Sequence, residues 1–281
     1  MTLTTDPPRL TPPTQQTHPP LRSTASQLRF PMLRTIMALI LREMAATHGR
    51  SPGGYIWMVL EPVLGIALLT VVFSAGFRTP PIGSNFAIFY ATGILPFSLY
   101  TDLSNKIAQS INYSRALLSY PRVTFIDTII ARLTLTVLTQ CLVHFLILTG
   151  IRSFADTRTS LEFSRLLMSY AMVISLAIGI GLLNCYLMTR FPLYQRAWGI
   201  MMRPLFLLSG VILLYENMPR RVQEILWFNP LQHAIGEMRA AFYVQYHATY
   251  VTPVYVFGVA AVLGLTGIIF LRRYHRDMLE Q

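Results

Sequence analysis

Charged side chains in or beside long apolar stretches are the residues of this sequence whose types could do chemistry. Glu61, Asp127, Arg132 and Arg203 are such residues. Ionised groups are costly in hydrocarbon, so inside a membrane they line a polar route, brace a gate or form ion pairs. Ion pairing near the membrane surface is slightly favoured for Asp127 and Arg132, and both functions remain open for Glu61, which precedes Pro62.

The third apolar stretch contains two uncharged polar side chains near its middle, Gln140 and His144. A single histidine among apolar residues is more often a hydrogen-bonded packing residue than a proton relay. We therefore expect these side chains to pack, and a proton-coupled carrier has little support.

Sequence motifs for catalysis, nucleotide binding and metal binding are missing. Lys106 is the only lysine, no glycine-rich run precedes it and Ile107 follows it, so it cannot belong to a phosphate-binding loop. The six histidines are dispersed, and Cys141 and Cys185 lie apart in apolar stretches. We expect no catalytic residue, metal site or cofactor in this chain, and any ATP and Mg²⁺ would be bound by another chain.

The charged and polar side chains named above lie in or beside six long apolar stretches, and the helices that these stretches form must position them. The chain is 53% hydrophobic and only 12% charged, with a mean hydropathy of +0.47. A helix needs about 20 apolar residues to cross the hydrocarbon core of a bilayer. The sequence therefore predicts an all-α integral membrane protein with six transmembrane helices, over 55–76, 86–101, 133–151, 166–188, 197–214 and 250–271.

The basic residues predict how these helices are oriented. Although the net charge is +11, the basic residues lie between the apolar stretches and do not gather in one soluble module. This pattern favours the positive-inside rule over nucleic-acid binding. With a cytoplasmic N-terminus, Lys and Arg on the cytoplasmic side outnumber those on the outer side by two to one. We expect both termini in the cytoplasm.

The remaining segments divide the chain into a tail, an interface helix and a transmembrane domain. Residues 1–30, rich in Pro and Thr, predict a disordered cytoplasmic tail. Residues 31–50 show the apolar periodicity of an amphipathic helix in the membrane interface, the alternative being a solvated helix packed on a partner. Residues 51–281 form the transmembrane domain.

Two connections in that domain are longer than a turn. The cytoplasmic loop 102–127 contains a short polar helix at 105–113. The outer segment 215–249 contains two short helices separated by Asn229 and Pro230. Neither of these two is long enough to span, so we expect them to dip into the outer leaflet as a re-entrant hairpin.

Aromatic side chains are frequent in the first two stretches, among them Tyr55, Trp57, Phe97 and Tyr100. Aromatic rings stack on the C–H faces of sugar rings, so a conduit lined by them could hold a sugar polymer without binding it too tightly to release it. An aromatic belt at the membrane surface and packing against lipid are the alternative, and account for more than half of such residues.

Several short motifs agree in order with one known family. They are Leu41-Arg42-Glu43, Gly49-Arg50, Gly54-Tyr55-Ile56-Trp57, Leu60-Glu61-Pro62, Gly93-Ile94-Leu95-Pro96-Phe97, Ile126-Asp127-Thr128-Ile129-Ile130-Ala131-Arg132, and Trp227-Phe228-Asn229-Pro230-Leu231-Gln232-His233 with Arg239. From about Leu41 to the C-terminus the sequence resembles permease subunits of bacterial ABC-2 exporters of capsular polysaccharide, which have the type V ABC exporter fold. The Pro- and Thr-rich extension before Gln27 departs from the family pattern.

The resemblance implies a half-transporter in the inner membrane of a Gram-negative bacterium. Two copies of the chain would assemble with two copies of a separate cytoplasmic ABC ATPase. The cargo would be a long anionic capsule polymer on a lipid terminus, passed on to a periplasmic polysaccharide co-polymerase and an outer-membrane export protein. Within the same class, an exporter of O-antigen, teichoic acid or a drug remains open; an ATP-independent scaffold or carrier is the alternative from another class.

The resemblance also implies four groups of site residues. They are Asn105, Lys106, Gln109, Ile111, Asn112, Tyr113 and Arg115 for coupling to the ATPase; Arg42, Glu43 and Arg50 in the interface helix beside the ATPase; Tyr55, Trp57, Glu61, Phe97 and Tyr100 in the polysaccharide conduit; and Trp227, Asn229, Pro230, His233 and Arg239 in the hairpin at the exit.

Overall fold

The computed structural model describes residues 31–48, 54–118, 124–155 and 159–280, and every regular element in these ranges is helical. The predicted tail and Arg50 lie outside the described residues. The elements are α1 (Pro31–His48), α2 (Gly54–Gly76), α3 (Phe86–Ala108), α4 (Ser110–Leu118), α5 (Phe125–Phe154), α6 (Phe163–Arg190), α7 (Pro192–Leu208), the 3-10 helix η1 (Tyr215–Asn217), α8 (Arg220–Leu226), α9 (Pro230–Phe242) and α10 (Pro253–Glu280).

Five of the described helices are long and apolar enough to cross a membrane. Their spanning segments are Ile56–Gly76, Phe86–Ala108, Phe125–Phe154, Phe163–Arg190 and Pro253–Tyr274. The shortest has 21 residues and therefore rises about 31 Å, the thickness of the hydrocarbon core. Five of the six predicted stretches thus coincide with helices that can span.

The fifth predicted stretch, 197–214, begins and ends several residues later than the helix that the structure has there. It falls on α7, which has 17 residues and begins at Pro192, a residue suited to the first turn of a helix. The helix ends at Leu208 because Gly210 adopts a left-handed conformation with a φ of 75°. The apolar residues beyond Gly210 belong to a turn and do not extend the helix.

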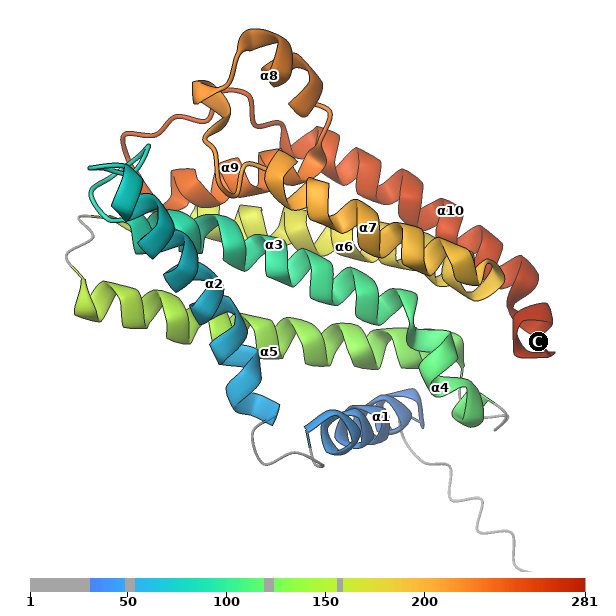
Figure 1. Cartoon of the computed structure of the whole chain (residues 1–281). Helices are drawn as coiled ribbons and strands as arrows, with labels where there is room; N and C mark the ends of the chain where they lie inside the picture. Colours follow the sequence, from blue (N-terminus) through green and yellow to red (C-terminus); the bar gives the residue numbers. More distant parts are fainter. Residues whose placement is uncertain (1–30, 49–53, 119–123, 156–158, 281) are drawn as a thin grey trace, which may run out of the picture. The chain divides into compact units, whose positions relative to one another are not determined.

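The polar helix predicted at 105–113 is divided between two elements. Its first residues complete the last turns of α3, and the rest begin α4. Gln109 separates the two helices, and its backbone N–H donates to the carbonyl of Asn105. The break redirects the chain, so that α4 leaves the end of α3 at an angle (Figure 1).

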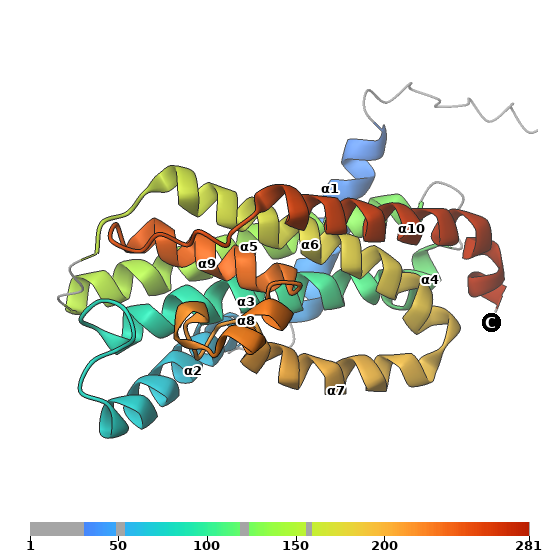
Figure 2. The ribbon, with the colours of Figure 1, turned by 90° about the horizontal axis from the view of Figure 1, so that it is seen from above.

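Helix α6 is central to the bundle and packs against α3, α9 and α10. Gly179 of α6 permits the closest of these contacts, because a Cβ there would collide with the backbone carbonyl of Ala260 in α10. By contrast, Ile66 is the only buried side chain among those described in α2, and α7 has no buried residue. Figure 2 shows α7 along one side of the bundle, away from α5.

Candidate functional site

Arg132 joins four helices near the end of the bundle where α4 lies. Its guanidinium forms a 3.2 Å ion pair with Glu43 of α1 and donates a 3.0 Å hydrogen bond to the carbonyl of Lys106 in α3. The same guanidinium lies 4.1 Å above the ring of Tyr113 in α4. We call Glu43, Lys106, Tyr113 and Arg132 the Arg132 clasp.

The ion pair of the clasp is largely shielded from solvent, since the side chains of Arg132 and Glu43 are 7% and 14% exposed. Shielding strengthens the attraction between the two charges and makes each of them costly without the other. The sequence had favoured ion pairing for Arg132, and the structure confirms it and identifies the partner as Glu43. The neighbouring Arg122 lies outside the described residues, so the expectation that Asp127 pairs with an arginine stays a prediction. Among the described residues, the Asp127 carboxylate accepts from the N–H and hydroxyl of Thr124 and caps the start of α5.

Helix α4 presents a buried face and an exposed face. Ile111 is 2% exposed, and the hydroxyl of Ser110 contacts the Cys185 sulfur of α6 at 3.6 Å. Gln109 and Asn112 are exposed, as is Tyr113 at 42%. A partner protein could therefore reach these three side chains, whereas Ile111 packs inside the bundle.

Three of the predicted coupling and interface residues, Glu43, Lys106 and Tyr113, meet at Arg132. Asn105 and Lys106 are half-buried in the last turns of α3, and Arg42 is exposed on α1. The side chain of Arg115 lies outside the described residues, as does all of Arg50.

The predicted conduit residues do not form one lining. Trp57 is 61% exposed on α2, and Glu61 is exposed one turn further on. Phe97 and Tyr100 are buried in α3, where the Phe97 ring packs edge-on against Phe206 of α7 with 5.1 Å between centroids. The side chain of Tyr55 lies outside the described residues.

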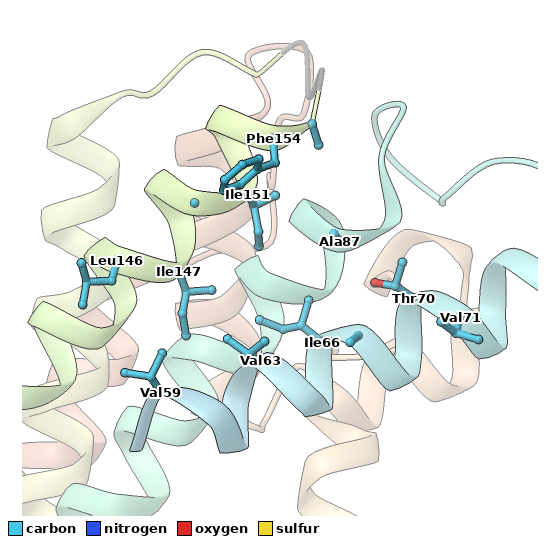
Figure 3. Close-up of a pocket in the computed structure, with 13 residues that line it drawn as sticks. Val59, Val63, Ile66, Thr70, Val71, Ala87, Leu146, Ile147, Ile151 and Phe154 are labelled. Atoms are coloured by element: carbon cyan, nitrogen blue, oxygen red, sulfur yellow. The ribbon is translucent and has the colours of Figure 1, made fainter. Parts of the chain in front are cut away.

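An apolar groove separates α2 from α5 and has a volume of about 550 Å³ (Figure 3). Val59, Val63 and Ile66 of α2 face Ile147 and Ile151 of α5 across it. Such a surface suits lipid chains, because a hydrated sugar polymer would leave its hydroxyl groups without hydrogen-bond partners there. This face of α2 is therefore poorly suited to line a conduit for sugar.

Two pairs of polar side chains connect α3 to α5 in the middle of the bundle. Gln140 donates to the carboxylate of Asp102, and one turn further on His144 lies 3.4 Å from the hydroxyl of Ser98. The other ring nitrogen of His144 lies 2.9 Å from the Tyr170 hydroxyl of α6. These contacts agree with the expected packing function of Gln140 and His144. Asp102 is a partner that the sequence does not predict, because the second predicted stretch ends at residue 101.

The two short helices expected around Asn229 and Pro230 are confirmed as α8 and α9, and their predicted depth in the membrane stays a prediction. Asn229 caps α9 through a 3.1 Å hydrogen bond from the backbone N–H of Leu231. Its amide also donates to the carbonyl of Leu208 at 3.1 Å. The same residue thus begins α9 and holds the end of α7.

Arg239 holds the turn after α7 through a buried hydrogen bond. It is 1% exposed, donates a 3.0 Å hydrogen bond to the carbonyl of Val211 and lies 4.3 Å above the ring of Phe89. Burial lowers the pKa of Arg239, and the nearby tyrosine side chains and the Glu216 carboxylate partly offset that effect.

His233 links the same helix to the chain that enters α10. One ring nitrogen lies 2.7 Å from the carbonyl of Trp227, and the other accepts a hydrogen bond from the N–H of Thr252. This arrangement requires the neutral ring, and burial lowers the pKa of His233 accordingly. Trp227, Asn229, His233 and Arg239 are therefore brought together, mainly as anchors of the hairpin.

Comparison with known proteins places this architecture in a family. The family model described as ABC-2 type transporter matches residues 34–243, from α1 to the end of α9. The chain belongs to the ABC-2 type transporter family. The match covers the Arg132 clasp, the polar pairs and the α8–α9 hairpin within one family domain.

Curated relatives match most of the chain. It is 28% identical over 245 residues to the polysialic acid transport protein KpsM of Escherichia coli, covering 87% of this chain and 95% of the relative. It is 26% identical over 249 residues to the capsule polysaccharide export inner-membrane protein CtrC of Neisseria meningitidis serogroup A, covering 88% and 94%. It is 24% identical over 250 residues to the corresponding protein BexB of Haemophilus influenzae, covering 88% and 94%.

Proposed function

We propose that this chain is the permease subunit of an ATP-driven exporter that moves capsular polysaccharide across a bacterial inner membrane. The observation that carries the proposal is the ABC-2 family match over 34–243, joined by relatives whose names state capsule export. A separate ABC ATPase would bind ATP and Mg²⁺, and this chain would have no catalytic site of its own.

The ATPase would dock on the exposed face of α4 and on Gln109 just before it, with Gln109, Asn112 and Tyr113 as contact residues. Movement of α4 would reach the bundle through the Arg132 clasp, because Arg132 contacts Tyr113 directly and belongs to the long helix α5. Packed helices move as rigid blocks, so a displacement at α4 is passed on to the membrane. Ion pairing with Glu43 would keep α1 beside the same subunit.

Two copies of the chain would form the path. Helix α2 has one buried side chain among those described and α7 has none, and a second copy would cover the faces of these helices that lie away from the α2–α5 boundary. Trp57 and Glu61 on α2, with the exposed Arg196 and Arg203 on α7, would then face an anionic glycan. Phe97 and Tyr100 would shape this path indirectly, because α3 buries both.

The topology in this proposal has six crossings, with α7 as the fifth and both termini in the cytoplasm. The 17 residues of α7 rise about 25 Å, which reaches across most of the hydrocarbon core. The α8–α9 hairpin would then dip into the outer leaflet, next to a periplasmic co-polymerase and an outer-membrane export protein.

Reconstitution with and without an ATPase tests the proposal. Vesicles holding this chain and its cognate ATPase should move a lipid-linked capsular glycan only when ATP is present. A variant ATPase that binds but does not hydrolyse ATP is the control. Glycan movement by this chain alone would refute the proposal, and movement of O-antigen, teichoic acid or a drug in its place would change the cargo class.

A further inference from the structure

A second groove lies on the opposite side of α5, between α5 and α6. Its volume is about 610 Å³, and most of its lining side chains are apolar, including Phe145, Leu148 and Leu166. Phe242 of α9 also lines it. We call this surface the α5–α6 groove, and the surface in Figure 3 the α2–α5 groove.

The α5–α6 groove has the length of one membrane leaflet. On α5 it extends from Cys141 to Arg152, and on α6 from Phe163 to Ile174. Each segment rises about 16 Å, and half of a hydrocarbon core of about 30 Å is about 15 Å. Because α5 ends at Phe154 and α6 begins at Phe163, one end of the groove lies at the membrane surface and the other near the midplane.

The surface end of the groove carries a cation. Arg152 lines the groove, is exposed and has no carboxylate partner within the described part of the chain. The nearby carboxylates of Glu162 and Glu237 both lie against Arg165, at 2.9 Å and 3.9 Å. Among the described side chains that line the groove, Arg152 is therefore the cation without a carboxylate partner.

We propose that one acyl chain of a phospholipid from the surrounding bilayer occupies the α5–α6 groove, with its phosphate on the Arg152 guanidinium. An apolar slot one leaflet long with a guanidinium at its surface end matches an acyl chain joined to a phosphate, because guanidinium and phosphate form paired hydrogen bonds. The bilayer supplies this ligand at high concentration, so the proposal does not depend on the cargo or on an ATPase.

The α2–α5 groove provides an internal control. It has nearly the same volume and also follows α5, but its lining contains no charged side chain. Lipid chains that merely surround the protein would enter both grooves without regard to their headgroup. A lipid held by Arg152 would favour the α5–α6 groove and would require a phosphate.

Photo-crosslinking in vesicles tests the proposal. The full-length chain is reconstituted with a phosphatidylglycerol probe that carries a diazirine halfway along one acyl chain, and adducts are located by peptide mass spectrometry. We expect Arg152→Gln to lower adducts in the α5–α6 groove at least threefold and Arg152→Lys to keep most of them. Adducts in the α2–α5 groove should stay unchanged in both variants, which also shows that the variants are folded.

Three results would overturn the proposal. They are unchanged adducts in Arg152→Gln, equal labelling of the α5–α6 groove by a diacylglycerol probe that lacks a phosphate, and a crosslink between two copies of the chain at this groove. A fourth would be a glycolipid mass for the species retained there, because the occupant would then be the lipid terminus of the cargo and not a bilayer phospholipid.

Discussion

Breaking the ion pair of the Arg132 clasp should loosen α1 and α4 from the bundle. Glu43→Gln leaves the buried Arg132 charge with a backbone carbonyl and the Tyr113 ring as its nearest partners. Removing one partner of a buried ion pair costs about 3 to 5 kcal/mol. By contrast, Glu162→Gln breaks the exposed pair with Arg165, whose side chains are 55% and 37% exposed, and such pairs contribute about 1 kcal/mol or less.

A double-mutant cycle measures the clasp directly. The variants are Glu43→Gln, Arg132→Gln and their combination, and the free energy of unfolding in detergent is measured for each. We expect an interaction energy of about 2 kcal/mol, since residues in contact deviate from additivity by about 0.5 to 3 kcal/mol. In vesicles with the ATPase, the single variants should also lower the amount of glycan exported per ATP hydrolysed.

Additivity would refute this reasoning. If the effects of the two single variants add to within about 0.5 kcal/mol, the two charges do not interact and the clasp does not hold α1. Equal losses of stability in Glu43→Gln and Glu162→Gln would contradict the argument from burial.

Three further predictions concern α4, the turn after α7 and the α8–α9 hairpin. Tyr113→Ala should uncouple ATP hydrolysis from export while the membrane dimer still assembles, and unchanged export in this variant would remove the docking assignment. Ile111→Ala should instead lower the free energy of unfolding by about 2 to 5 kcal/mol, because that side chain is buried. Gly210→Ala should lower the melting temperature measurably, because alanine at a φ of 75° costs about 1 to 2 kcal/mol and its Cβ would collide with Gln232. Gly199→Ala is the control and should leave the melting temperature unchanged, because a Cβ at Gly199 meets open space. Because burial lowers the pKa of His233, the unfolded state binds a proton at this histidine at a higher pH than the folded state does. The free energy of unfolding should therefore fall by up to about 1.4 kcal/mol per pH unit below about pH 6.5. Thermal unfolding of His233→Gln should lose this pH dependence, and an equal slope in the variant would show that another group is responsible.

Membrane class and most of the helix positions were predictable because they depend on local composition. An apolar run of sufficient length determines a spanning helix wherever it packs, and Asn229 and Pro230 are a local signal for the start of α9. The ends of helices were harder to predict. Nothing in the hydropathy of 197–214 shows that Gly210 adopts a positive φ, because the contact with Gln232 that accompanies it comes from another helix.

The residue pairs that meet in the candidate site were harder to predict from the sequence, because their members are far apart along the chain. Glu43 and Arg132 both stood out by type, yet only the fold shows that they pair across 89 residues. The burial of Phe97, Tyr100 and Ile111 follows from the central position of α3 and its neighbours, which local patterns do not encode. The sequence therefore identified aromatic and polar residues as candidates for the site but did not show whether each one lies on the surface or in the core.

The end of α7 has a consequence for how the protein is made. The carbonyl of Val211 receives its hydrogen bond from Arg239, which is 28 residues further along the chain. At a synthesis rate of about 5 to 20 residues per second, this donor leaves the ribosome about 1 to 6 s after its acceptor. During that interval the end of α7 lacks this hydrogen bond, so its final structure forms only after the α8–α9 hairpin has been synthesised.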